Sequence, residues 1–219
     1  MMRKMMFAAL ALTALTAAAA PKSTAKPYWL DPSVNRVGTE THRASFLSYD
    51  SKEQAKQETW SSRYMSMEGQ WKFKFVKNHQ DAPVGFFQEK YDDASWELFP
   101  VPGLFELNGH GDRIYKNVGY AWNTQFHNKP GFVEEKNNYT GSYRRSFQVP
   151  AEWKGQDIYI HVGSATSNLR LWVNGKEVGY SEDSKIAAEF NVTKFMRPGD
   201  KNLVAMQVMR WCDGSYGED

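Results

Sequence analysis

Apolar and polar side chains alternate in short runs over the second two thirds of the chain. The clearest run is at residues 71–75, where Trp71, Phe73 and Phe75 alternate with Lys72 and Lys74. Successive side chains of a strand point to opposite faces, so this run predicts a strand with one buried face.

Five further runs follow the same pattern and are separated by turn residues, at 96–101, 143–149, 157–162, 168–173 and 202–211. Asn174-Gly175 follows the fourth run and is typical of a type I′ hairpin turn. Many short strands at this spacing indicate an all-β sandwich or barrel.

Two regions lack this alternation. Residues 21–60 are polar and carry Pro27 and Pro32, which predicts an extended arm, with a short helix at 51–59 capped by Ser51. Residues 102–140 hold glycines, asparagines and aromatics with little periodicity, which predicts a long loop. Loops of this length in compact domains are usually functional or disordered, and the aromatics argue against disorder.

The first 20 residues have the layout of a secretory signal peptide. Arg3 and Lys4 precede a short apolar run, and a string of alanines ends near Ala20. The run is shorter than the roughly 20 residues that span a bilayer. We therefore expect cleavage near Ala20, a periplasmic or secreted protein, and no membrane attachment after cleavage.

Charge and cysteine content narrow the possible partners. Removing Arg3 and Lys4 leaves 25 basic and 25 acidic side chains, so the mature chain has no net charge to attract nucleic acid. The chain has a single cysteine, Cys212, which excludes an intramolecular disulfide. Eight tryptophans and an aromatic share of 15% suit either a carbohydrate site or an aromatic β core.

No catalytic group is evident in the chain. The acidic pairs at 92–93, 134–135 and 218–219 are adjacent residues that point to opposite faces of an extended chain, and we interpret them as solvated charges. The five histidines lack metal-ligand spacing, and no nucleophile elbow or phosphate-binding glycine loop is present.

Three segments resemble the N-terminal region of bacterial β-galactosidases of glycoside hydrolase family 2: SMEGQWKFKFV (66–76), VPGLFELNGHGDRIYKNVGYAW (101–122) and the block at 163–219 that contains RWCDGSY. The resemblance covers nearly all of 35–219. It implies a jelly-roll β-sandwich of the galactose-binding-like type over 61–219, cut at its C-terminal end. In that family an immunoglobulin-like domain and a (β/α)8 barrel follow, and two barrel glutamates catalyse retaining hydrolysis.

The resemblance also implies site residues. The family positions in RIYKNV and RWCDGSY that reach the substrate correspond to Asn117 and Asp213. The family aspartate also helps to hold a sodium ion, so Asp213 is the candidate metal ligand, and a magnesium ion is expected in the barrel. Turn chemistry offers a plainer role, since Asp213-Gly214 is a good turn dipeptide and Asn117 can satisfy loop backbone groups.

Other side chains in these segments receive structural roles. Trp211 and Cys212 are expected to be packed rather than to bind sugar, and Trp122 and Phe126 remain unassigned between sugar stacking and packing.

The sequence thus predicts the N-terminal, sugar-binding portion of a β-galactosidase that acts on terminal β-D-galactose. Its expected partners are a β-galactoside and the remaining domains of the enzyme, which is a candidate homo-oligomer. Two alternatives stay open: a stand-alone carbohydrate-binding module, and a related family 2 enzyme such as a β-glucuronidase or β-mannosidase.

Overall fold

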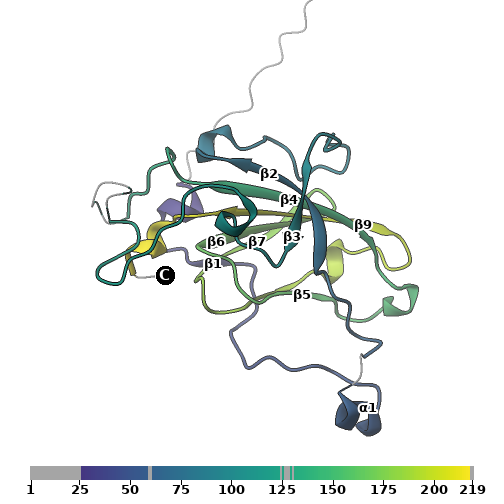
Figure 1. Ribbon diagram of the computed structural model, residues 1–219. Helices are drawn as coiled ribbons and strands as arrows, with labels where there is room; N and C mark the ends of the chain where they lie inside the picture. Colours follow the sequence, from purple (N-terminus) through teal and green to yellow (C-terminus); the bar gives the residue numbers. More distant parts are fainter. Residues whose placement is uncertain (1–25, 59–60, 124, 126–128, 130, 218–219) are drawn as a thin grey trace, which may run out of the picture.

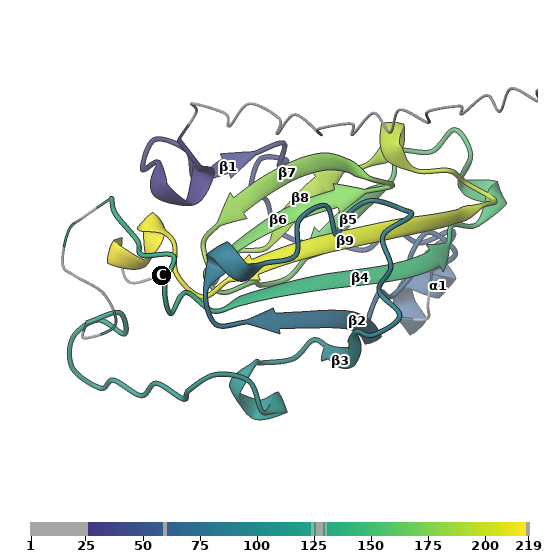
Figure 2. The same ribbon diagram turned by 90° about the horizontal axis from the view of Figure 1, so that it is seen from above.

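The computed structural model describes residues 26–58, 61–123, 125, 129 and 131–217, so the predicted signal peptide and Phe126 lie outside the described residues. Figures 1 and 2 show an all-β architecture. Its strands are β1 (Arg36–Val37), β2 (Gly69–Val76), β3 (Glu97–Val101), β4 (Thr140–Gln148), β5 (Tyr159–Val162), β6 (Asn168–Val173), β7 (Lys176–Glu182), β8 (Ala188–Asn191) and β9 (Lys201–Met209).

The strands form two antiparallel sheets. The larger has the order β1-β7-β6-β9-β4-β2-β3, and the smaller consists of β5 and β8. One buried cluster joins their facing surfaces, with Phe73, Leu171 and Val204 from the large sheet and Phe190 from β8. The predicted all-β sandwich is therefore confirmed.

Strand β2 shows why the period-two pattern worked. Trp71 and Phe73 are 3% and 0% exposed, whereas Lys74 between Phe73 and Phe75 is exposed. The predicted hairpin between β6 and β7 is also present, with φ of 50° at Asn174 and 80° at Gly175. Positive φ at both central positions is what a type I′ turn requires.

Part of the N-terminal segment packs onto the sandwich, whereas the sequence predicted an extended arm. Trp29, in a single 3₁₀ turn (Tyr28–Leu30), is buried, and β1 pairs with β7 at the edge of the large sheet. Beyond residue 40 the chain extends away from the sandwich to helix α1 (Lys52–Gln57) (Figure 1). The Gln54 N–H donates to the Ser51 hydroxyl at 3.2 Å, which confirms Ser51 as the N-cap.

The region from Pro102 to Tyr139 contains no strand among its described residues. It holds one 3₁₀ turn, Glu106–Asn108, and the next strand begins at Thr140. Other single 3₁₀ turns are His79–Asp81, Ala151–Trp153, Thr193–Phe195 and Asp213–Gly217. No helix among the described residues is long and apolar enough to cross a membrane.

Asp93 corrects the interpretation of the adjacent acidic pairs as solvated charges. The Arg144 guanidinium, only 4% exposed, donates through Nε to an Asp93 carboxylate oxygen at 2.6 Å. Arg144 also donates to the backbone oxygens of Phe86 and Gln88. A buried guanidinium needs such partners, so Asp93 fixes the 86–93 loop onto β4.

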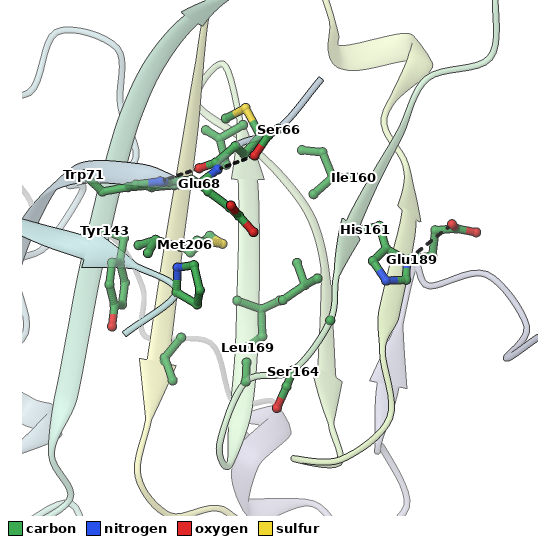
Figure 3. A pocket seen from close by; sticks show the side chains of 18 of the residues that line it. Ser66, Glu68, Trp71, Tyr143, Ile160, His161, Ser164, Leu169, Glu189 and Met206 are labelled. Carbon is green, nitrogen blue, oxygen red and sulfur yellow. Dashed lines mark hydrogen bonds and ion pairs between the residues drawn. The ribbon is translucent and has the colours of Figure 1, made fainter. Parts of the chain in front are cut away.

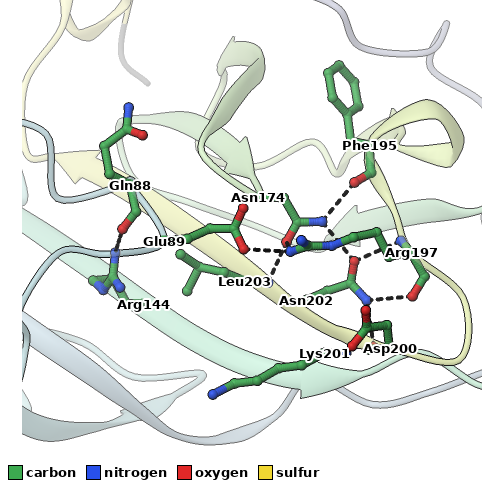
Figure 4. A network of polar contacts seen from close by, with 10 residues as sticks. All are labelled: Gln88, Glu89, Arg144, Asn174, Phe195, Arg197, Asp200, Lys201, Asn202 and Leu203. Carbon is green, nitrogen blue, oxygen red and sulfur yellow. Dashed lines mark hydrogen bonds and ion pairs between the residues drawn. The ribbon is translucent and has the colours of Figure 1, made fainter.

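A buried amide network ties the β6–β7 turn to the start of β9 (Figure 4). Asn202, 1% exposed, donates to the backbone oxygens of Arg197 and Asp200 at 3.0 and 2.9 Å. Its side-chain oxygen accepts from the Arg197 N–H and from the Asn174 amide at 2.9 and 2.8 Å. One side chain therefore satisfies four polar groups in two loops.

Replacing Asn202 with alanine should lower the free energy of unfolding by about 2–4 kcal/mol, because the buried partners lose their hydrogen bonds. The matched control is Lys201→Ala at the neighbouring exposed position, expected within about 0.5 kcal/mol of wild type. Urea unfolding of the three proteins measures both effects. Equal midpoints for Asn202→Ala and Lys201→Ala would contradict this role.

His79 should make stability depend on pH. Burial, and then the charge of Arg170, lower the pKa of His79 to about 4 from 6.5. The folded state disfavours the charged imidazole, so the free energy of unfolding keeps its full value above pH 6.5, where His79 is neutral in both states. As the pH falls from 6.5 toward 4, only the unfolded state gains the proton, and the free energy of unfolding decreases by roughly 2–3 kcal/mol. Unfolding of His79→Gln should therefore depend less on pH across this window than unfolding of wild type, whereas the exposed-site control His42→Gln should follow wild type.

Candidate functional site

The candidate site is built on the turn that follows the last strand. The Trp211 N–H donates to the Asn138 side-chain oxygen, and the Asn138 amide donates back to the Trp211 carbonyl, both at 2.9 Å. The Cys212 N–H donates to the Ser215 hydroxyl at 3.1 Å. Trp211 and Cys212 are 7% and 0% exposed, which confirms their packed roles. These contacts position the start of the 3₁₀ turn at Asp213.

Asp213 is a buried carboxyl group that lies beside a second one, that of Glu182. It is 7% exposed, and neither oxygen makes a hydrogen bond of standard geometry with the described residues. Burial raises the pKa of Asp213, while the nearby Glu182 carboxyl and the N–H groups of Gly214 and Asp213 act in the opposite direction. A buried carboxylate is costly unless its charge is compensated, so this side chain fits a role toward a ligand or cation.

Glu182 lies beside Asp213 and was missed by the sequence analysis. It ends β7, is 9% exposed, and accepts a hydrogen bond from the Tyr180 hydroxyl at 2.5 Å. Burial raises the pKa of Glu182 to about 8. Tyr180 and Glu182 are two positions apart and therefore lie on the same face of β7. An acidic residue at an inward position of a strand was the signal in the sequence that could have identified Glu182.

The two carboxyl groups converge with a thiol. One ligand atom each from Glu182, Cys212 and Asp213 lie within 4.8 Å of one another. Carboxylate oxygens are the donors preferred by hard cations. The neighbouring carboxyl groups of Asp213 and Glu182 therefore fit the sodium ion implied by the family resemblance.

Asn117 makes no contact with this cluster through a hydrogen bond or ion pair among the described residues. It is exposed on the long loop. The same loop does pass the turn, since Lys116 and Trp122 help to line a hollow of about 310 Å³ together with Trp211 and Ser215. The Trp122 ring packs against Tyr216 with centroids 4.7 Å apart and is 8% exposed. In this structure Trp122 is part of the packing around the turn.

Comparison with known proteins places these features in a family. The sequence profile described as "Glycosyl hydrolases family 2, sugar binding domain" matches residues 64–219. The chain belongs to glycosyl hydrolase family 2. The matched range includes the whole turn at Asp213, the loop with Asn117 and all strands except β1.

Individual family 2 relatives carry a more specific name. The chain is 34% identical over 196 residues to a β-galactosidase of Priestia megaterium, covering 88% of this chain and 19% of that protein. It is 33% identical to a β-galactosidase of Vibrio cholerae, covering 87% of this chain and 18% of that protein. This family 2 chain therefore spans about a fifth of the length of these relatives.

Among solved structures, the chain is similar to a β-glucuronidase from Ruminococcus gnavus. The identity is 21%, the TM-score is 0.48, and the match covers 66% of this chain and 21% of that one.

Proposed function

We propose that the chain is the N-terminal sugar-binding portion of a β-galactosidase that hydrolyses terminal, non-reducing β-D-galactose residues. The observation that carries the proposal is Asp213, a buried carboxyl group inside RWCDGSY that lies beside a second buried carboxyl, that of Glu182. The β-galactosidase relatives support the choice of galactose. The catalytic glutamates belong to parts of the enzyme outside this chain, and the chain supplies groups that contact the substrate.

In the complete enzyme, Asp213 would hold the sodium ion and accept a hydrogen bond from a galactose hydroxyl. An ionised carboxylate only accepts hydrogen bonds, so its two oxygens can serve a cation and a hydroxyl together. The Glu182 carboxyl would lie beside the cation as a second oxygen donor. Asn117, exposed on its loop, is free to meet a substrate hydroxyl as donor and acceptor. The magnesium ion is assigned to the barrel.

The proposal includes export to the periplasm or beyond after cleavage of residues 1–20. Its basis is the basic start, short apolar run and alanine string of those residues. The remaining domains of the enzyme are the partners of this chain, and homo-oligomer formation is proposed for the complete enzyme.

Substrate choice tests the proposal against its alternatives. For the enzyme expressed from its full gene, kcat/KM for p-nitrophenyl β-galactoside should exceed the values for the β-glucuronide and the β-mannoside by roughly 100-fold or more, as expected for a site whose polar groups match one sugar. A preference for either other glycoside would assign a related family 2 enzyme. Absence of any hydrolysis by the full product would favour the carbohydrate-binding module.

A further inference from the structure

One buried arginine fastens the loop that carries Asn117 to the turn that carries Asp213. Arg210, three positions before Asp213 and 9% exposed, donates through Nη2 to the Asp112 carbonyl at 2.8 Å. Its guanidinium also lies 3.6 Å from a Glu106 carboxylate oxygen. A buried guanidinium needs partners for its donors, and both of these partners belong to the long loop. Arg210 therefore holds the loop at two points.

Tyr139 makes a second connection to Asp112. The Tyr139 hydroxyl donates to Asp112 Oδ1 at 2.6 Å, and the Arg210 guanidinium lies 4.8 Å from the centre of the Tyr139 ring. Burial, and then the hydrogen bond to Asp112, raise the pKa of Tyr139, so the hydroxyl keeps its proton and remains a donor. Gly111 lets the chain pass over the ring, because its φ is 71° and a side-chain carbon there would come within 2.5 Å of the ring. The loop is thus fitted to Tyr139 at residues 111–112.

The residue before Tyr139 fixes the turn. Asn138, 0% exposed, exchanges two hydrogen bonds with the backbone of Trp211. The backbone of Tyr139 itself accepts a hydrogen bond from the Arg210 N–H at 2.8 Å. Two consecutive residues therefore hold the turn and the loop, so both are anchored to one stretch of backbone.

Asn117 lies just beyond the point where the loop is held. Ile114 and Trp122 pack in one buried cluster with Trp211. The stretch 115–121 between them is exposed and carries Asn117. The contacts of Arg210 and Tyr139 come directly before this stretch along the chain and set where it starts.

A hollow between the two sheets borders these contacts (Figure 3). Leu169 and Met206 line its interior, and Glu106, Ile114 and Arg210 also line it. Side chains in close-packed interiors have contacts on all sides, and a hollow removes some of these contacts. The polar contacts of Arg210 therefore contribute more to holding the loop than they would in a filled core.

We propose that Tyr139, Asp112 and Arg210 are positioning residues for the substrate. Together they hold the loop so that Asn117 and Asp213 can meet one sugar at the same time. The inference rests on the proposed function, in which those two side chains contact the galactoside. Two groups assist one substrate only when their separation matches it, and a misplacement of about 1 Å can cost on the order of 100-fold in rate. The three residues act through Asn117 and not by contact with the sugar.

A double-mutant cycle in the complete enzyme tests the proposal. Tyr139→Phe removes the hydroxyl and keeps the ring, and it should lower kcat/KM for p-nitrophenyl β-galactoside by about 5-fold or more. In an Asn117→Ala background the same substitution should have an effect of less than about 2-fold, because the group that it positions is gone. The control Tyr91→Phe removes a hydroxyl in the 86–93 loop, from a ring that packs against Trp96, and should leave kcat/KM at the wild-type value.

Variants of Asp112 add a rescue and a second entry to the cycle. Asp112→Ala removes the acceptor and should lose as much activity as Tyr139→Phe. Asp112→Asn keeps an oxygen that can accept from the Tyr139 hydroxyl, so it should lose much less. Asp112 is exposed, so Asp112→Ala should fold even if Tyr139→Phe does not, and it can replace Tyr139→Phe in the cycle with Asn117→Ala.

Hydrogen exchange of the backbone amides at 113–119 gives a readout without activity. Exchange in the complete enzyme should be at least about 5-fold faster in Tyr139→Phe and in Asp112→Ala than in wild type, because the start of the stretch is no longer held. Asp112→Asn should exchange more slowly than Asp112→Ala.

The outcomes separate this proposal from the proposed function. The same loss from Tyr139→Phe with and without Asn117, or unchanged exchange in Tyr139→Phe, would overturn the positioning role, while hydrolysis of the galactoside by wild type would leave the proposed function intact. If the enzyme prefers another glycoside, the proposed function fails, and the cycle measured with that glycoside still decides the positioning role. If the enzyme hydrolyses no glycoside, both fail.

Discussion

The purified 219-residue chain is expected to release no chromophore from p-nitrophenyl β-galactoside above the level of a mock purification. Retaining hydrolysis needs two carboxyl groups about 5–5.5 Å apart on either side of an accessible glycosidic bond. Glu182 and Asp213 are close together, but they are 9% and 7% exposed, and Glu182 already accepts a hydrogen bond from Tyr180. No substrate bond can enter between two such buried groups.

The control for this prediction is Glu182→Gln in the same chain. Turnover above the mock level that disappears in Glu182→Gln would make the buried pair catalytic and contradict the account. Turnover that survives in Glu182→Gln would point to another catalytic group in the chain and contradict it equally.

Asp213→Asn in the complete enzyme should lower kcat/KM by roughly 10- to 100-fold, equivalent to the 1.5–3 kcal/mol typical of a hydrogen bond to a charged group. Asparagine keeps the size and tolerates the same turn conformations, so the melting temperature should change little. The matched control is Asp200→Asn at a turn before β9, where the Asp200 carboxylate accepts from the Lys201 N–H. Its kcat/KM should equal that of wild type.

The fold was predictable wherever a strand was long enough to show its period. In β2, Phe73 points into the core and Lys74 points to solvent, so the alternation is visible in the sequence. The β6–β7 turn is specified by Asn174-Gly175. Strand β1 has two residues, too few for an alternation to stand out, and β8 was missed although it is as long as the predicted β5. Their pairing is decided by contacts with distant segments, such as the register of Val37 with Tyr180.

The site was only partly predictable. Resemblance selected Asp213, and the structure adds its burial and the neighbouring Glu182 carboxyl. Glu182 was missed because it is 31 positions from Asp213 in the printed sequence, and only the fold brings the end of β7 to the turn after β9. The role of Asn117 stays a prediction, since its loop is exposed and its expected ligand belongs to the complete enzyme.

The sodium dependence of kcat/KM in the complete enzyme, compared between wild type and Asp213→Asn, tests the central claim most directly. If Asp213 holds sodium and the galactoside together, wild-type kcat/KM rises as sodium replaces potassium at constant ionic strength. Asp213→Asn would start lower and respond little, because the amide lacks the charge that binds the cation. Unchanged activity of Asp213→Asn together with an unchanged sodium response would contradict the account and leave Asp213 as a turn residue.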